Sequence, residues 1–228
     1  MDAIKKVNWL AHRWPIKERT LPYGGWPADR VARNVSQREK LVAAFDPAKV
    51  AQVGDIVAPF ELDGSHGETL TLDTLTADGP VVLIFFRYAG CPACNLALPY
   101  YNRQLWPALK AAGIKLVAVS LHLPETGLGE IRDRHALGFP VATDRGNLLG
   151  RRFGITFSQG EVPSEPTTPG WIGELTGTGT VEFPQPAVIL IDQDRTVRFV
   201  DVSPDWLIRA EAPAILQAAN RLPKPVSG

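Results

Sequence analysis

The sequence has no net charge, few cysteines and no long apolar run, and each absence excludes a class of protein. Its 24 Lys and Arg residues balance 24 Asp and Glu residues, so the composition favours neither a nucleic-acid partner nor an anionic membrane. No stretch approaches the roughly 18 apolar residues that span a bilayer. Residues 1–15 carry scattered charges and lack the apolar core of a signal peptide, which predicts a cytoplasmic protein without a membrane partner.

The small number of cysteines limits the chemistry that this protein can perform. Only Cys91 and Cys94 are present, three positions apart. A disulfide between them closes too short a loop to restrict the unfolded chain much, so it would contribute little to stability. Zinc would need two more ligands, and the four histidines show no paired spacing. We therefore expect no metal and no other cofactor, and redox chemistry at the pair.

What the sequence does contain is enough apolar material for a core. It has 228 residues, of which 45% are hydrophobic, and this length suits one domain with an extension. Residues 1–47 are basic and hold three of the six tryptophans, and a helix is expected over residues 28–45. This extension should dock on its own domain or on a second copy in a homodimer, because such an aromatic cluster rarely stays in water. Residues 48–228 form the second unit.

Beyond about residue 52 the pattern is that of an α/β fold. Continuous apolar runs predict central strands covered on both faces, at 81–86, 114–120 and 187–192. The first two flank a helical stretch that reaches about residue 112, so they should be parallel strands of a right-handed βαβ unit. Shorter strands are expected at 70–72, 139–142 and 196–200, and helices at 125–137, 147–153 and from 204 to about 221. A long irregular loop is expected at 157–186, which either covers the site or packs elsewhere.

The cysteine pair begins a helix where a buried strand ends. The sequence reads Phe86-Arg-Tyr-Ala-Gly-Cys-Pro-Ala-Cys94, and Pro92 suits the first helical position. Open α/β sheets place their sites at this edge. We expect a lowered pKa for the Cys91 thiol, because a helix N-terminus favours the thiolate, and we expect Arg87 to add positive potential. Since Cys94 lies one turn further on and is less exposed, Cys91 should attack and Cys94 should resolve the product.

Neighbouring residues leave alternatives open. Gly90 and Pro92 indicate an exposed turn, which disfavours two buried, inert cysteines. Tyr88 either hydrogen-bonds a substrate or a sulfenate, or packs against the motif, and the packing role is favoured. His122 should lie at the same sheet edge, where a solvated loop position is favoured over a proton shuttle.

These motifs resemble a known family. The stretch Cys91-Pro-Ala-Cys94, followed by Pro99, is similar to the active-site helix of the thioredoxin fold. Residues 53–62 are similar to the opening segment of the AhpC/TSA peroxiredoxin-like group. Further segments follow in that group's order, at 117–120, 139–144 and 199–202. The resemblance covers about residues 52–220 and implies a thioredoxin-like fold, with a central mixed sheet flanked by helices and an N-terminal extension outside it.

The resemblance also assigns site residues, and two positions depart from the family's pattern. It implies that Pro186 is a cis-proline that faces the cysteine pair. Peroxiredoxins carry Thr or Ser three residues before the first cysteine, where this chain has Tyr88, and Arg near the start of a later core strand, where it has Gln185-Pro186-Ala187. Such groups orient the peroxide for attack, and Arg87 or Tyr88 would have to take their place.

The function implied by the resemblance is that of an antioxidant enzyme, a thiol-dependent peroxidase. Cys91 would become a sulfenic acid on reaction with a hydroperoxide, and Cys94 would close a redox-active disulfide. A thioredoxin-like or other dithiol protein would reduce it. The two departures favour an alternative, a thiol–disulfide oxidoreductase that acts on protein or small-molecule disulfides. A second alternative is a non-enzymatic redox sensor or binding module.

Overall fold

The computed structural model describes residues 27–158 and 171–222, whose strands form one seven-stranded sheet and one two-stranded ribbon. The strands are β1 (Glu61–Gly64), β2 (Thr69–Thr71), β3 (Val81–Phe85), β4 (Lys115–Ser120), β5 (Val141–Thr143), β6 (Thr156–Ser158), β7 (Glu182–Pro184), β8 (Ala187–Ile191) and β9 (Val197–Val202). The helices are α2 (Ala28–Ala44), α3 (Leu72–Thr76), α4 (Pro92–Gln104), α5 (Trp106–Ala111), α6 (Glu130–Arg134), α7 (Leu148–Arg152), α8 (Ile172–Leu175) and α9 (Ala212–Ala219), with short 3-10 turns at Pro47–Lys49, Pro124–Thr126 and Arg145–Asn147.

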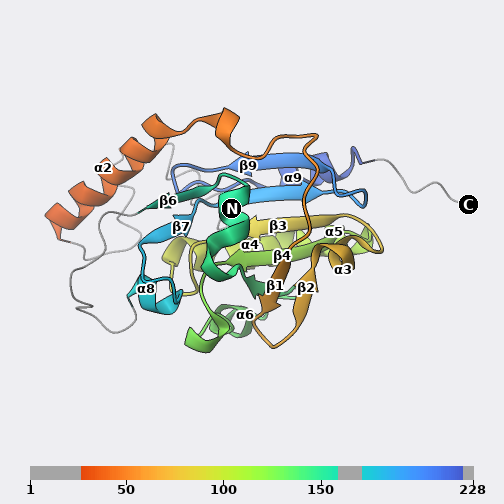
Figure 1. Ribbon diagram of the computed structural model, residues 1–228, viewed down its shortest axis with the longest axis horizontal. Helices are drawn as coiled ribbons and strands as arrows, with labels where there is room; N and C mark the ends of the chain where they lie inside the picture. Colours follow the sequence, from red (N-terminus) through yellow and green to blue (C-terminus); the bar gives the residue numbers. More distant parts are fainter. Residues whose placement is uncertain (1–26, 159–170, 223–228) are drawn as a thin grey trace, which may run out of the picture.

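The large sheet is mixed, in the order β2-β1-β5-β4-β3-β8-β9 (Figure 1). β3 pairs with β4 in parallel and with β8 in antiparallel orientation. Its five residues are all buried, because side chains alternate between two covered faces. The three long predicted strands and the parallel βαβ unit are therefore confirmed.

Helices cover both faces of this sheet. Val82 and Ile84 point into one apolar cluster, which includes residues of α4, α5, α6 and α9. The other three residues of β3, Val81, Leu83 and Phe85, point into a second cluster, with residues of α3 and α7. In Figure 1, α7 lies in front of the sheet, drawn in teal near the centre of the view. The cysteine-bearing α4 packs on the opposite face.

Several predicted helices are shorter than expected, for local reasons. The stretch to residue 112 divides into α4 and α5, because Pro107 has no N–H to continue the backbone ladder beyond Leu105. The helix predicted from residue 204 begins only at Ala212. The predicted loop at 157–186 holds β6, α8 and β7, and its residues 159–170 lie outside the described part of the chain.

Helix α2 is the described part of the N-terminal extension, and it docks on the segment after β9. Arg38 is 1% exposed, and its Nη1 lies 3.4 Å from Oδ1 of Asp205. Its guanidinium carbon is 5.8 Å from the ring centroid of Trp206. The extension's tryptophans all lie among residues 1–26, outside the described part, and the boundary at residue 47 stays a prediction.

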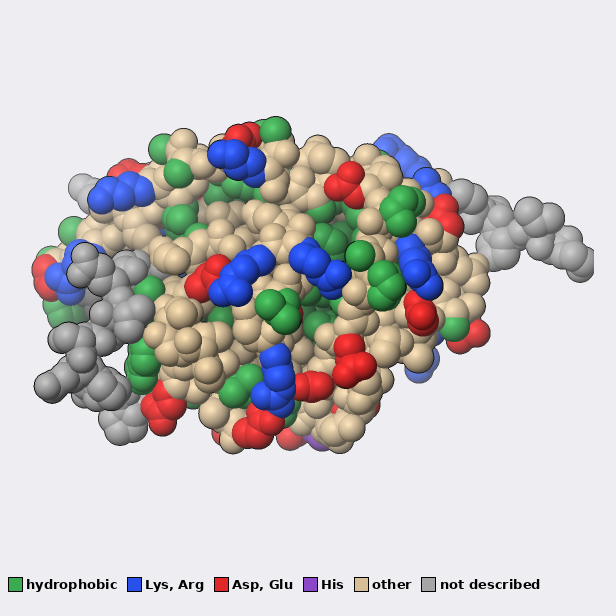
Figure 2. All heavy atoms as spheres, in the orientation of Figure 1, with side chains coloured by type: hydrophobic (Ala, Val, Ile, Leu, Met, Phe, Trp, Pro, Cys, Tyr) green, Lys and Arg blue, Asp and Glu red, His purple; other side chains and the backbone are tan. Residues whose placement is uncertain are grey.

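The surface gives two further observations. Figure 2 shows positive and negative side chains interspersed on the α7 face of the molecule, without a patch of one sign. Within residues 27–158 and 171–222, no helix has the length and apolar character needed to cross a membrane.

The ion pair between α2 and Asp205 should contribute strongly to stability. We expect Arg38→Met to lower the free energy of unfolding by about 3–5 kcal/mol, because it leaves a buried carboxylate without its cation. Arg33→Met is the matched control on the same helix, since Arg33 and Asp29 are 71% and 64% exposed, and it should change stability by less than about 0.5 kcal/mol. Urea unfolding measures both. Equal effects of the two substitutions would show that α2 does not depend on the buried pair.

Candidate active site

Both cysteines lie at the start of α4, at the carboxyl end of β3. Cys91 is the N-cap residue, Pro92 occupies the first helical position, and both thiols are free. The turn residues Gly90 and Pro92 are exposed, as expected. Cys91 is nevertheless 1% exposed and Cys94 0% exposed, so the expectation that the cysteines are not buried is wrong. The pair belongs to the same apolar cluster as Trp206 and Phe183, residues that come from distant parts of the chain.

The loop that leads into the motif is tied to the end of β4. The Ser120 hydroxyl donates to the carbonyl of Arg87 at 2.9 Å. The Ala89 N–H donates to Nδ1 of His122 at 3.2 Å, and Nε2 of His122 lies 3.1 Å from the carbonyl of Thr126. These partners require a neutral ring that accepts at Nδ1 and donates at Nε2.

His122 is therefore a structural group of the site and not a solvated loop residue. It is 4% exposed. Burial lowers its pKa, and the Thr126 carbonyl and Glu130 only partly oppose that effect. The expected solvated position is wrong because His122 reaches across the sheet edge to the cysteine loop.

Asn95 holds the same loop from the other side. Its Nδ2 donates to the carbonyl of Ala89 at 2.8 Å and to that of Cys91 at 2.9 Å. Its Oδ1 accepts from Nε2 of His135 at 2.8 Å and from Nη1 of Arg134 at 3.0 Å. The peptide groups of Ala89 are thus held at both N–H and carbonyl, which fixes the entry of the chain into α4.

The pKa values of the two thiols are shifted in opposite directions. Burial opposes ionisation of Cys94, but the hydrogen bond from the Cys91 thiol, the Arg209 guanidinium and the Arg87 backbone N–H together lower its pKa to about 5. The same hydrogen bond, followed by burial, raises the pKa of Cys91 well above its usual value. Nη2 of Arg209 lies 3.7 Å from Sγ of Cys94.

The raised pKa of Cys91 contradicts the lowered pKa expected for this thiol. The helix dipole effect is small beside a thiol–thiolate hydrogen bond and a neighbouring cation in a buried site. The Cys91 side chain accepts no hydrogen bond from the N–H groups in the first turn of α4.

Arg87 and Tyr88 pack against aromatic rings. The guanidinium carbon of Arg87 lies 4.5 Å from the ring centroid of Trp206 and 4.7 Å from that of Phe183. The charge of Arg87 also lowers the pKa of both thiols, as expected. The ring of Tyr88 is 5.9 Å from that of Phe183, which agrees with the favoured packing role.

Pro186 lies at the expected edge but in the other isomer. The described residues contain no cis peptide bond, so the expected cis-proline is wrong. The next residue, Ala187, pairs with Phe85 at the end of β3, and the carbonyl of Pro186 accepts from the N–H of Ser203 at 2.8 Å. Pro186 thus helps to hold the segment that follows β9.

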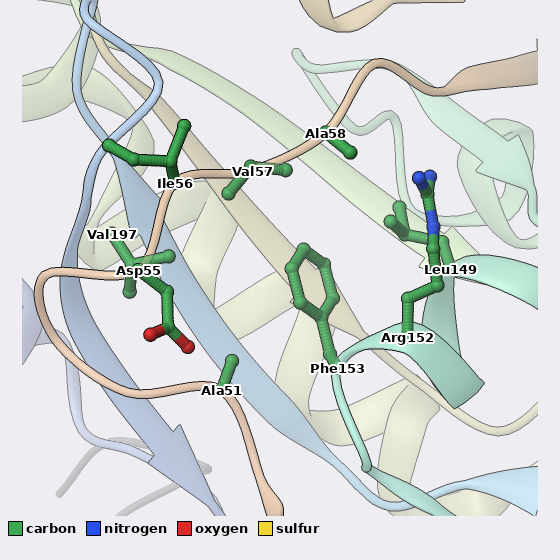
Figure 3. A pocket seen from close by; sticks show the side chains of 9 residues that line it. All are labelled: Ala51, Asp55, Ile56, Val57, Ala58, Leu149, Arg152, Phe153 and Val197. Carbon is green, nitrogen blue, oxygen red and sulfur yellow. The ribbon is translucent and has the colours of Figure 1, made fainter.

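A cavity of about 380 Å³ lies away from the cysteines. Figure 3 shows Phe153, at the end of α7, in the middle of the side chains that line it, with Asp55 and Arg152 on opposite sides. Phe153 and Val57 belong to the cluster on the other face of the sheet. The cavity is therefore separate from the site, and the described residues hold no group of three His, Cys, Asp or Glu side chains suited to a metal ion.

Asn95 and Arg209 are site residues that sequence reasoning missed. Asn95 directly follows the motif, so its position beside Cys94 was a usable signal. Arg209 is separated from Cys94 by 115 positions, and nothing in the local pattern of residues 204–211 points to the cysteines. That segment was predicted as helix, which would not have suggested a site.

Comparison with known proteins gives a family and a fold. A model of the family described as AhpC/TSA matches residues 53–200. The thiol-disulfide oxidoreductase ResA of Halalkalibacterium halodurans is 28% identical over 113 residues, which are 49% of this chain and 61% of that protein. A putative peroxiredoxin of Mycobacterium tuberculosis is 28% identical over 104 residues, which are 46% of this chain and 66% of that protein. The chain thus covers less than two thirds of either relative.

Solved structures support the fold. The crystal structure of peroxidoxin BcpB from M. tuberculosis has a TM-score of 0.59 at 22% identity, and the match covers 76% of this chain and 99% of that one. The solution structure of a putative protein disulfide isomerase from Bacteroides thetaiotaomicron has a TM-score of 0.52 at 17% identity, covering 75% and 89%. These matches confirm the expected thioredoxin-like fold with its mixed central sheet.

The neutral His122 should make stability depend on pH. Its pKa is lower in the folded protein than the usual value of about 6.5 in an unfolded chain. The unfolded state then binds more protons as the pH falls below about 6.5, so this group's contribution to stability is present above that pH and is lost below it.

His122→Asn isolates this effect, because an amide oxygen can replace Nδ1 as acceptor and does not titrate. Urea unfolding of wild type and variant at pH 7.5 and pH 5.5 should show a steeper loss of stability in the wild type. All other titrating groups are shared, so they cancel in the comparison. Parallel losses would contradict a buried neutral His122.

Proposed function

The chain belongs to the AhpC/TSA family, and we propose that it is a peroxiredoxin-like oxidoreductase in which Cys91 and Cys94 form a redox-active disulfide. The observation that carries this proposal is the placement of two buried cysteines three residues apart at the start of α4, with Nη2 of Arg209 3.7 Å from Sγ of Cys94. The raised pKa of Cys91 and the lowered pKa of Cys94 agree with it. One sulfur holds a proton and the other can accept it. Such a pair can generate a nucleophile without a separate base.

The proposed reaction uses the charge as the site arranges it. The Cys91 proton passes to Cys94, and Sγ of Cys91 attacks the terminal oxygen of a hydroperoxide. The O–O bond breaks, the S–O bond of a sulfenic acid forms, and the leaving alkoxide takes the proton from Cys94 to become an alcohol. Cys94, again a thiolate, attacks Sγ of Cys91, so that the disulfide forms and hydroxide leaves. Two electrons pass from the sulfurs to the peroxide.

A dithiol protein of thioredoxin-like type would then restore the thiols. Its thiolate would attack one sulfur of the pair, and its second thiol would release the mixed disulfide, so that the reductant ends as a disulfide. The cytoplasmic location and the homodimer are further parts of this proposal. Cell fractionation and sedimentation analysis of the purified protein test them separately.

The peroxidase step predicts rapid oxidation by hydrogen peroxide. Stopped-flow tryptophan fluorescence of the reduced protein should report it through Trp206, whose ring lies in the cluster that holds the cysteines. We expect a rate at least 100-fold above that of a free thiolate, with disulfide as the product. Cys91→Ser should abolish this phase, whereas Cys94→Ser should stop at the sulfenic acid, seen by mass as the gain of one oxygen. A wild-type rate equal to that of a free thiolate would exclude the peroxidase.

Disulfide exchange is a second candidate, supported by the packing of Tyr88 where a peroxide-orienting hydroxyl is expected. It uses the same sulfurs on a protein or small-molecule disulfide, without a peroxide step. The oxidised protein would transfer its disulfide to a reduced dithiol, or the reduced protein would cleave a protein disulfide such as those of insulin. Turnover here, with slow peroxide oxidation, would favour this function. Slow reaction in both assays would leave the redox sensor.

A further inference from the structure

The segment between β9 and α9 places a buried guanidinium against one of the two sulfurs. Arg209 is 5% exposed, and its Nη2 lies 3.7 Å from Sγ of Cys94. Its Nη1 donates to the carbonyl of Ile208 at 2.7 Å and also to that of Trp206. The fork of the guanidinium is therefore divided, with one nitrogen on the backbone and the other at the sulfur.

Helix α4 itself holds this segment in place. The Tyr101 hydroxyl donates to the carbonyl of Ala210 at 2.6 Å, and the Ala212 N–H donates to the Tyr100 hydroxyl at 3.1 Å. Both tyrosines are at most 1% exposed and lie two turns along the helix that carries Cys94. The element that carries the sulfur thus also fixes the chain just after its cation, because both bonds lie within the three residues that follow Arg209.

A second contact secures the other end of the segment. Asp205 pairs with Arg38 of α2 and accepts from the N–H of Leu207 at 3.0 Å. The carboxylate of Asp205 is thus engaged with another arginine. Nη2 of Arg209 is directed at Sγ of Cys94.

We propose that Arg209 is a catalytic residue that holds the negative charge on Cys94, so that this sulfur serves as the base for Cys91 and then as the resolving nucleophile. The part that this charge plays in the reaction rests on the proposed function. The position of Arg209 beside Cys94 does not. A cation within about 4–6 Å of a buried acid lowers that acid's pKa by about 1–3 units. A guanidinium keeps its own proton throughout, so it can stabilise the thiolate in both steps without titrating.

The charged groups around the pair come from two elements. Arg87 faces it from the loop after β3, and Arg209 from the segment before α9. Arg87 has its guanidinium stacked on the rings of Trp206 and Phe183, whereas Arg209 contacts the sulfur itself. Removal of Arg209 should therefore have the larger effect on the ionisation of Cys94.

The test measures the ionisation of Cys94 alone. In the Cys91→Ser protein a single thiol remains, and thiolate absorbance at 240 nm gives its titration between pH 3 and pH 9. We expect Arg209→Gln to raise the apparent pKa of Cys94 by at least one unit, a tenfold or greater fall in the thiolate-to-thiol ratio at any given pH. Arg209→Lys should restore at least half of that shift, because it keeps the charge. Arg103→Gln, at an exposed position of α4, should leave the titration unchanged.

Gln and Lys both lose the guanidinium fork, so a merely structural role would affect the two variants equally. Equal titrations of the Gln and Lys variants, or a shift below 0.3 unit (about twofold) for Arg209→Gln, would overturn the proposal. If Arg209→Gln does not fold, Arg209→Lys in the Cys91→Ser protein is compared with Cys91→Ser alone. A low pKa of Cys94 retained with lysine supports the role of the charge. A pKa at the ordinary cysteine value contradicts it. No peroxide or disulfide enters this titration, so failure of the proposed function leaves its result intact.

Discussion

The burial of two neighbouring thiols beside two arginines is the constraint on which the site depends. In a nonpolar interior a thiolate is unfavourable unless hydrogen bonds and cations stabilise it. Here Nη2 of Arg209 contacts Sγ of Cys94, and Arg87 adds charge from the adjoining loop. These groups and the neighbouring Cys91 thiol lower the pKa of Cys94 despite its burial.

The rest of the fold serves to hold these groups at fixed distances. Ser120 and His122 at the end of β4 hold the loop from one side, and Asn95 holds it from the other. The tyrosines of α4 bind the segment that carries the arginine. These contacts join α4, β4 and the segment before α9 into one polar network, and such networks gain strength when every member is satisfied. Substrate must still reach sulfurs that are at most 1% exposed, so the chemistry requires a local opening of this packing.

How much could be predicted from the sequence depends on how far apart along the chain the interacting residues lie. The central strands, such as β3, were predictable because a continuous apolar run of this length, rich in β-branched residues, is typical of a buried strand in an α/β protein. The start of α4 at Pro92 was likewise a local signal. The break at Leu105 was missed although its cause, Pro107, is visible in the sequence. The late start of α9 was missed because an apolar pattern typical of a helix does not show where the helix begins. The cis isomer expected for Pro186 came from resemblance alone, and the backbone does not adopt it.

The cysteine pair was recognisable from the sequence, since two residues three positions apart at a helix start lie on one helix face. Its redox chemistry stays a prediction. The family and the fold class also followed from motifs that are short and local. The burial of the pair, the neutral state of His122 and the charge on Cys94 were not accessible in this way. Each depends on groups brought together across the sheet, and Arg209 lies 115 positions from the sulfur that it contacts. Electrostatic effects in a protein interior depend on distance in space and on burial, and sequence separation specifies neither.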